Sequence, residues 1–364
     1  MSTTAEDRQQ LVVYFTKGVG DVVAREIRTI APGAHIRELT EKFAVVEVDA
    51  SDVDRVRTEA RTTDDTRLLV AGTRSVADPA GFAAMCSEAA EATRSFLDRH
   101  GSERAGSELW SVTLSARNPV WRRRPQWDPG PEITRHLGGA ELTARSRQPV
   151  DLRIQVDGDV MHAAVNLEPV PITASPAGPP RLGALRRSVA AVLVQLGIDA
   201  ADPETLGRGL YDPCCGTGTI VAEAARLGMP VYGSDMDPAA VDITRARLAA
   251  PGGEVPVLAD GAIQQRIFTH DLLRGIPGRV DSSIVVSNLP WGKQVSLPRR
   301  GDFFDMCAAL AGRTFAAGGG CAFLTTHEDQ LVARLRKHAP GANVTARRIG
   351  LLGQTPAIVT VQQG

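Results

Sequence analysis

Polar and glycine-rich residues follow three apolar segments that the sequence predicts as strands. The first segment ends at Asp212 and enters an Asp-x-x-x-Gly-x-Gly loop whose glycines are Gly216 and Gly218. Residues without a Cβ allow backbone to approach a bound ligand closely. The helix expected at 219–227 adds unpaired N–H groups and a partial positive charge at its start. The loop therefore predicts a ligand pocket at the end of this strand.

The second predicted strand, 231–234, ends in Asp235 and is followed by Met236. An acid at this point of a doubly wound fold binds two ribose hydroxyls. The dinucleotide fingerprint needs a third glycine, but Val221 stands there, which disfavours the packing of a nicotinamide dinucleotide site. The pattern favours another nucleoside-bearing cofactor over an ordinary strand-loop-helix turn. Asp212 is expected to support either the amino group of this cofactor or the loop itself.

The third predicted strand, 284–287, ends in Asn288-Leu289-Pro290-Trp291. An exocyclic amine conjugated to a ring is a poor nucleophile because its lone pair is delocalised. The side-chain oxygen of Asn288 and a backbone carbonyl next to Pro290 could accept both N–H groups and draw the nitrogen toward tetrahedral geometry. Trp291 could stack on a flipped-out base, as base-modifying enzymes require. The alternative is a plain turn with Trp291 as a core aromatic, and the cofactor loop makes the catalytic interpretation the stronger one.

Two acids are candidates for a hydrogen bond from an adenine amine. Asp271 is expected in a short segment between a helix and a strand, and Asp260 would end a strand at 257–260. A solvated loop acid is the alternative for Asp271. A basic run upstream combines phosphate-binding charge with aromatic faces, so it is a candidate RNA contact, although such a run is usually a solvated loop. The residues of this run are Arg117, Trp121, Arg122, Arg123 and Arg124.

Composition limits the classes of protein to consider. The 364 residues are 43% hydrophobic and 23% charged with a net charge of −1, so a nucleic-acid site must be a local patch. The five cysteines form no Cys-x-x-Cys, and adjacent Cys214 and Cys215 are poorly spaced for a metal. An odd count without a secretory signal fits the cytoplasm. No apolar run reaches the ~20 residues that cross a bilayer, so we expect no membrane partner.

The chain divides into three parts and a linker. Residues 1–72 have the β-α-β-β-α-β order of a ferredoxin-like unit. Residues 73–170 begin with a helix and end in a hairpin, with a strand at 110–115 between them. The proline-rich segment 171–182 is the expected linker. Residues 183–364 alternate helices and strands and close with an antiparallel hairpin, so we predict an α/β, Rossmann-like, seven-stranded domain.

Three motifs and one further segment resemble a known family. Asp-Pro-Cys-Cys-Gly-Thr-Gly-Thr, Gly-Ser-Asp-Met-Asp and Asn-Leu-Pro-Trp-Gly-Lys resemble the motifs of class I S-adenosylmethionine-dependent methyltransferases. More narrowly they resemble those of the THUMP-domain RNA guanine-N2 methyltransferases, and Leu182–Ser188 resembles the opening of their catalytic domain. The resemblance covers most of the chain and is most specific at the three motifs. The N-terminal half agrees with the family in the order and size of its parts.

The resemblance implies roles for the residues singled out above. S-adenosyl-L-methionine would bind at the loop from Asp212 through Cys214, Gly216 and Gly218, and at Asp235 with Met236. Catalysis would use Asn288, Pro290 and Trp291. Residues 73–170 would be a THUMP-like module that binds RNA. Leu289 replaces a proline that many amino-methyltransferases carry, and this removes no hydrogen-bond acceptor.

The predicted reaction is methyl transfer to the N2 of a guanosine, with tRNA as the favoured substrate. Ribosomal RNA, with a role in drug resistance, remains an alternative. Adenine-N6 methylation is the second enzymatic hypothesis, because the same tetrad serves any conjugated amine. A non-catalytic RNA-binding protein is the hypothesis from another class, and a nicotinamide oxidoreductase is the weakest. The sequence carries no prediction of oligomeric state.

Overall fold

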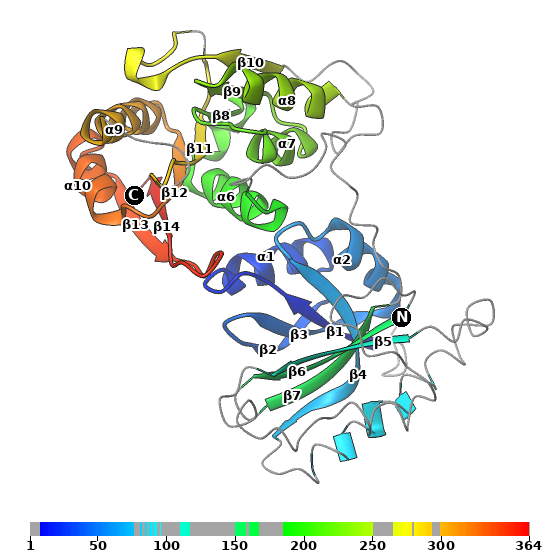
Figure 1. Ribbon diagram of the computed structural model, residues 1–364. Coiled ribbons are helices and arrows are strands. Elements are labelled where there is room, and N and C mark those ends of the chain that lie inside the picture. The colour runs from blue at the N-terminus through cyan, green and yellow to red at the C-terminus, as the bar shows by residue number, and fades with distance from the viewer. Residues whose placement is uncertain are drawn as a thin grey trace. The chain divides into compact units, whose positions relative to one another are not determined.

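The computed structural model describes residues 8–75, 110–116, 150–157, 160–166, 185–249, 265–278, 280–292 and 299–363, with short pieces between 81 and 95. The chain forms two compact units, shown in Figure 1. The N-terminal unit comprises Met1–Tyr14, Ile27–Ala60 and Asp65–Ile172. The catalytic unit comprises Phe15–Glu26, Arg61–Asp64 and Thr173–Gly364. Each unit is therefore assembled from segments that are distant in sequence.

The first half of the N-terminal unit has the predicted ferredoxin-like order. Antiparallel pairing places β1 between β3 and β4, and β3 pairs on its other side with β2. The elements are β1 (Arg8–Tyr14), α1 (Gly20–Ile30), β2 (His35–Leu39), β3 (Phe43–Asp49), α2 (Val53–Glu59) and β4 (Asp65–Ser75). The four strands follow the order β2-β3-β1-β4. The apolar residues of β1 and β3 are buried because helices and sheet close over them.

The sheet continues past the boundary that we predicted near residue 72. The predicted hairpin is present as β6 (Val150–Asp157) and β7 (Val160–Asn166), and β5 (Trp110–Ala116) pairs parallel to β6. Strand β4 runs on to Ser75 and pairs with β7, so all seven strands form one sheet. A single sheet thus takes strands from both of the predicted N-terminal parts.

The catalytic unit has the predicted seven-stranded Rossmann-like sheet. Its strand order is β10-β9-β8-β11-β12-β14-β13, in which the first five strands are parallel and β14 is antiparallel to both neighbours. The strands are β8 (Leu210–Asp212), β9 (Val231–Asp235), β10 (Gln265–Thr269), β11 (Ile284–Asn288), β12 (Gly320–Thr325), β13 (Asn343–Arg348) and β14 (Ala357–Gln362). The final antiparallel pair confirms the predicted hairpin at the sheet edge.

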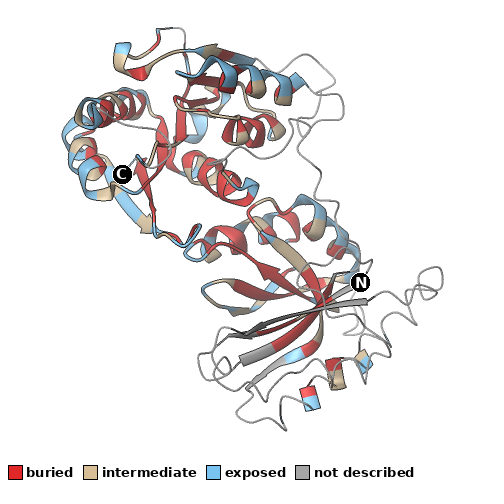
Figure 2. Ribbon diagram, in the orientation of Figure 1, coloured by how far each residue is buried: buried red, intermediate tan, exposed pale blue. Residues whose placement is uncertain are grey.

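Five helices cover the two faces of this sheet. Figure 1 shows α6, α7 and α8 on one face and α9 with α10 on the other. They are α6 (Arg187–Ala200), α7 (Thr219–Arg226), α8 (Pro238–Ala249), α9 (Arg300–Ala316) and α10 (Glu328–His338). The central strands β8 and β12 are buried throughout and β11 is buried up to Ser287, as Figure 2 shows for this layer. A parallel sheet covered on both faces needs such continuous apolar strands.

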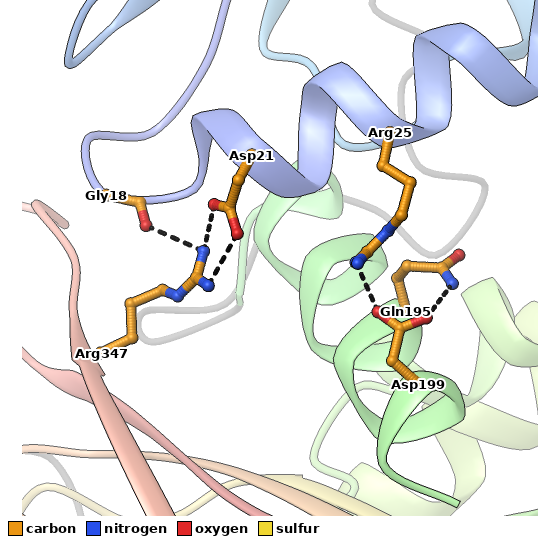
Figure 3. Close-up of polar contacts among 6 residues, drawn as sticks. All are labelled: Gly18, Asp21, Arg25, Gln195, Asp199 and Arg347. Atoms are coloured by element: carbon orange, nitrogen blue, oxygen red, sulfur yellow. Dashed lines mark hydrogen bonds and ion pairs between the residues drawn. The ribbon is translucent and has the colours of Figure 1, made fainter.

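Two segments from the first 64 residues belong to the catalytic unit. The Arg61 guanidinium makes two hydrogen bonds to the carboxylate of Glu223 on α7, at 2.7 and 3.1 Å, and Glu223 is only 3% exposed. Figure 3 shows two more ion pairs of this kind, Asp21 with Arg347 and Arg25 with Asp199. The contact between Arg61 and Glu223 differs from the other two because its acid is buried.

No helix among the described residues is both long enough and apolar enough to cross a membrane.

Candidate active site

The ends of β8, β9 and β11 lie together at one edge of the parallel sheet. β8 pairs with both of the other strands, with Asp212 opposite Gly233 and Leu210 opposite Ile284. The chain leaves β8 toward β9 on one side and reaches β11 on the other, so the direction of winding reverses here. Ligands of open α/β sheets bind at such a reversal. The predicted residues Asp212, Asp235 and Asn288 are therefore brought to a single edge.

The cofactor loop is fixed by the acid at the end of β9. Asp235 accepts a hydrogen bond from the backbone N–H of Gly216 at Oδ2 and one from Asp237 at Oδ1, both at 2.9 Å. Gly216 has φ of 53°, and no atom lies within 4 Å of the position that a Cβ would take. Only glycine adopts this backbone at no steric cost. The loop thus offers open, side-chain-free backbone beside a carboxylate that is already positioned.

Residues of α8 support the same loop, and the sequence analysis did not identify them. Thr244 donates its hydroxyl to the Gly216 carbonyl at 2.8 Å, and Arg247 donates to Thr219 Oγ1 at 3.0 Å. A Cβ on Gly218, whose φ is 79°, would lie 2.6 Å from Thr244 Cγ2. Gly218 is therefore needed both for its backbone conformation and for this close packing. In the sequence, only their separation by three residues, which places them on one side of a helix, could have indicated that they act together.

Asp212 is buried at the end of β8, where the cofactor loop begins, and its side chain contacts the neighbouring strand β11. It is 1% exposed and its Oδ1 accepts hydrogen bonds from Ser287 Oγ at 2.6 Å and from the Cys214 N–H at 3.0 Å. Burial raises the pKa of Asp212 to about 7, although the two hydrogen bonds work in the opposite direction. Of the two predicted roles, these contacts favour support of the loop. Ser287, which precedes Asn288, is another residue that the sequence analysis did not identify.

The two adjacent cysteines carry unreactive thiols. Burial raises the pKa of Cys214 well above its usual value, and burial likewise raises the pKa of Cys215. Because the thiolate is the nucleophile and metal ligand, neither side chain is suited to covalent chemistry. The part of the chain that the structure describes also holds no cluster of three metal-ligating side chains. Cys214 packs on the apolar core and gives the loop its backbone N–H contact with Asp212.

The acid Asp271 follows a strand that the sequence analysis did not predict. Strand β10 ends at Thr269, and Asp271 begins a short 3-10 helix by accepting the Leu273 N–H at 3.0 Å. The expectation that Asp271 lies between a helix and a strand is therefore wrong. Its competitor Asp260 lies outside the described residues. Since β10 is paired with β9, Asp271 lies just beyond a strand end adjacent to that of Asp235.

Exposed Met236 lies at the same edge of the sheet. Its side chain is 65% exposed although methionine is an apolar residue, and it directly follows Asp235. Asp237, the next residue, accepts the Ala239 N–H at 2.9 Å at the start of α8, as expected for a helix cap. An apolar side chain beside the acid predicted to bind a ribose is suited to cover a planar base.

The catalytic tetrad has one internal hydrogen bond. The indole N–H of Trp291 donates to Asn288 Oδ1 at 3.1 Å. Indole is a donor only, so this contact fixes which end of the amide faces it. An amide oxygen has two lone pairs, and Asn288 Oδ1 can accept a second hydrogen bond. Asn288, Pro290 and Trp291 are partly exposed, whereas Leu289 is buried.

Leu289 has a role that a proline could not fill. Its backbone N–H donates to the Leu324 carbonyl of β12 at 3.0 Å, and its side chain is fully buried. A proline at this position would have no N–H and would leave that carbonyl without its donor. The Leu289 carbonyl remains next to Pro290 as the predicted second acceptor. The departure from the family pattern thus changes how the tetrad is held but leaves its acceptors in place.

His327 lies beside the tetrad, and the sequence analysis assigned it no role. It follows β12, whose Leu324 is paired with Asn288, and its ring packs edge-on against Phe304 with ring centroids 5.7 Å apart. Burial and the charge of Arg300 lower the pKa of His327, and the backbone of Trp291 acts in the opposite direction. The neutral form of the imidazole is therefore favoured next to the tetrad.

The basic run of Arg117, Trp121 and Arg122–Arg124 lies outside the described residues. The predicted linker at 171–182 lies outside them as well. The RNA contact assigned to this run stays a prediction.

The residues at this sheet edge fit the cofactor that the motifs imply. The open backbone at Gly216, the fixed carboxylate of Asp235 and the exposed side chain of Met236 lie at successive points of the edge formed by β8 and β9. These features suit the close approach of a ligand, two ribose hydroxyls and a base face, respectively. Asp271 lies beyond the next strand and could accept from the base amine.

Comparisons with known proteins agree with this geometry. Residues 180–355 match a family model described as RMKL-like, methyltransferase domain. A curated relative, the type II methyltransferase M.VspI of Vibrio sp. (strain 343), is 36% identical over 92 residues. That match covers 24% of this chain and only 20% of the relative, so it says nothing of the rest of either protein.

Solved structures share the fold of almost the whole chain. TrmN from Thermus thermophilus has a TM-score of 0.68 with 21% identity, covering 98% of this chain and 100% of that one. SMU.472, a methyltransferase in complex with SAH, has a TM-score of 0.63 with 15% identity, covering 98% of both chains. Residues 180–355 therefore match a methyltransferase domain, and almost the whole chain shares the fold of these solved structures.

Proposed function

We propose that the protein transfers a methyl group from S-adenosyl-L-methionine to the N2 of a guanosine in RNA, with tRNA as the favoured substrate. The observation that carries this proposal is the tetrad Asn288–Trp291 at the end of β11, beside the cofactor loop at the end of β8. S-adenosyl-L-methionine supplies a methyl group already activated by its positively charged sulfur. The protein therefore has to present a nucleophile in line with that methyl group.

The tetrad offers what an exocyclic amine needs. Asn288 Oδ1 keeps a lone pair free of the Trp291 hydrogen bond, and the Leu289 carbonyl supplies the second acceptor. Two acceptors on one NH₂ group localise its lone pair on nitrogen, which can then form the new bond to carbon. The amine loses one proton to solvent as the methyl group leaves sulfur. Catalysis of this type depends on positioning and electrostatics more than on a protein base.

Guanosine in RNA is proposed from the motif resemblance together with the N-terminal unit. The three motifs resemble those of RNA guanine-N2 enzymes, and the N-terminal sheet begins with the ferredoxin-like order that precedes the catalytic domain in that family. The basic run at 117–124 would add phosphate contacts. The THUMP-like module is thus proposed as the part that selects the RNA, in the cytoplasm.

The test is turnover with labelled S-adenosyl-L-methionine on tRNA, ribosomal RNA and DNA taken from cells that lack the gene. Digestion to nucleosides should give N2-methylguanosine, with label in the tRNA fraction. N6-methyladenosine would support the second hypothesis, since the tetrad suits any conjugated amine. Label in ribosomal RNA alone would reassign the substrate. No label in any nucleic acid, with cofactor binding intact, would refute the proposal.

A further inference from the structure

An arginine at the start of α9 lies against the catalytic tetrad. Gly292, the residue after Trp291, has φ of 77°, and the position of a Cβ there lies 3.5 Å from Nη2 of Arg300. Arg300 also acts electrostatically on His327, which follows β12 beside the tetrad. Its guanidinium is therefore next to the backbone that follows the proposed base-stacking side chain.

This charge has no acidic partner among the described residues. Neighbouring arginines each hold a carboxylate: Arg299 with Asp302, Arg334 with Asp305 and Arg348 with Glu328. No such pair includes Arg300. The seven residues that separate it from Gly292 in sequence, 293–299, also contain no Asp or Glu.

The position makes an unpaired cation unfavourable. Arg300 is the first residue of a 17-residue helix, whose N-terminus carries a partial positive charge. A cation at this end of a helix is unfavourable, whereas an anion would be favourable. The same charge lowers the pKa of His327. An exposed arginine is usually paired with solvent alone, but here two sources of positive potential meet beside the tetrad.

We infer that Arg300 binds a backbone phosphate of the nucleotide whose base enters the tetrad. A flipped nucleotide must be held by its backbone while its base is read and modified. The planar guanidinium fork matches phosphate oxygens and forms charge-assisted hydrogen bonds. Such a contact would fix the register of the strand while leaving base choice to the pocket. This inference rests on the proposed nucleic-acid substrate and adds a residue that neither the motifs nor the resemblance assigned.

Charge removal provides the first test. Arg300→Ala should lower kcat/KM for tRNA about 10- to 100-fold, as loss of a charge-assisted contact does. It should also reduce the slope of log(kcat/KM) against log[salt] by about 0.7–0.9. Affinity for S-adenosyl-L-methionine, measured by calorimetry, should be unchanged. Arg300→Lys should retain part of the activity. Arg336→Ala is the matched control, because Arg336 is exposed on α10 and distant in sequence from the tetrad.

A neutral phosphate provides the second test. Short RNAs that contain one methylphosphonate, placed on either side of the methylated nucleotide, remove a single phosphate charge. At one of these positions the wild type should lose as much activity as Arg300→Ala does, and Arg300→Ala should lose nothing further. Equal salt slopes for Arg300→Ala and Arg336→Ala would overturn the inference, as would additive losses at both positions. A wild type without nucleic-acid methylation would instead refute the proposed function.

Discussion

The cofactor loop and the catalytic tetrad lie at one sheet edge but are held very differently. The loop is fixed by side chains from three neighbouring elements: Asp235 at the end of β9, Thr244 on α8 and Asp212 at the end of β8. The side chains of the tetrad have a single hydrogen bond between them, from Trp291 to Asn288. Beyond the tetrad lies a cation without an acidic partner in the described part of the chain. The cofactor loop is held by hydrogen bonds within the protein, whereas the tetrad and the cation beyond it can still form further contacts with a ligand.

The difference indicates how the two ligands are bound. A small cofactor binds tightly to a rigid pocket because little order is lost on binding. A flipped-out base, by contrast, would meet polar groups that gain a hydrogen-bond or charge partner only when the nucleotide binds. Asn288 Oδ1, the Leu289 carbonyl and Arg300 are the groups in question. Interactions made only at this stage contribute to rate more than to ground-state binding.

The largest effect is expected at the buried ion pair behind the cofactor loop. Arg61→Ala would remove both Arg61 hydrogen bonds from the buried Glu223 carboxylate on α7, the helix that begins at Thr219. Breaking a buried pair in this way costs about 3–5 kcal/mol of the free energy of unfolding. Denaturant unfolding should show this loss.

Two further variants isolate the cause of that loss. Adding Glu223→Gln to Arg61→Ala should restore part of the stability, because the buried charge is gone. Arg25→Ala breaks the exposed pair with Asp199 and should cost no more than about 1 kcal/mol. If Arg61→Ala and Arg25→Ala cost the same, the buried pair does not support the cofactor half as described.

The next effect is on cofactor affinity. Asp235→Ala removes the carboxylate proposed for the ribose hydroxyls and also releases the Gly216 N–H. Charge-assisted hydrogen bonds contribute about 1.5–3 kcal/mol each, so calorimetry should show at least a tenfold weaker S-adenosyl-L-methionine affinity. Asp237→Ala removes a helix cap two residues away and should leave affinity unchanged. Equal affinity for Asp235→Ala and wild type would mean that the ribose binds elsewhere.

A smaller effect, in pH dependence, tests the link between the two halves. The folded pKa of Asp212 is raised to about 7 from a reference of 3.8, so the folded state holds a proton that the unfolded state releases. Stability should therefore fall as pH rises from about 4 to about 7, by up to ~1.4 kcal/mol per pH unit, and this contribution should level off above pH 7. Asp212→Asn should lack this component. Parallel stability curves for the two proteins between pH 4 and 8 would show that Asp212 ionises normally.

The sequence predicted the parts of the site that follow from local pattern. Gly216, Gly218 and Asp235 lie at or just after the end of a strand. The change from apolar to polar or glycine residues at these points indicates where each strand ends. The seven-stranded sheet follows from the same alternation of strands and helices. Strand β10 was missed because Gln265–Thr269 is short and its outer residues are exposed, so no apolar run marks it.

The remaining features depend on tertiary contacts that no local pattern carries. Arg61 and Glu223 are 162 residues apart, and each alone is an ordinary charged residue. Ser287 and His327 are brought to the site only by the pairing of β11 with β8 and β12. A fragment cut at the predicted boundary, 183–364, would leave Glu223 without Arg61. We therefore expect this fragment to be less stable than the sequence alone implied.

The central claim is that Asn288 orients an amine for methyl transfer. Asn288→Ala should reduce kcat on RNA about 10²–10³-fold, as loss of one preorganised contact does. Its affinities for S-adenosyl-L-methionine and for RNA should stay within about threefold of wild type, because the contact forms mainly in the transition state. Single-turnover methylation of tRNA by both proteins, with nucleosides identified by mass spectrometry, is the direct measurement. Full activity in Asn288→Ala, or a methyl group on a ring nitrogen or ribose in the wild type, would contradict the account.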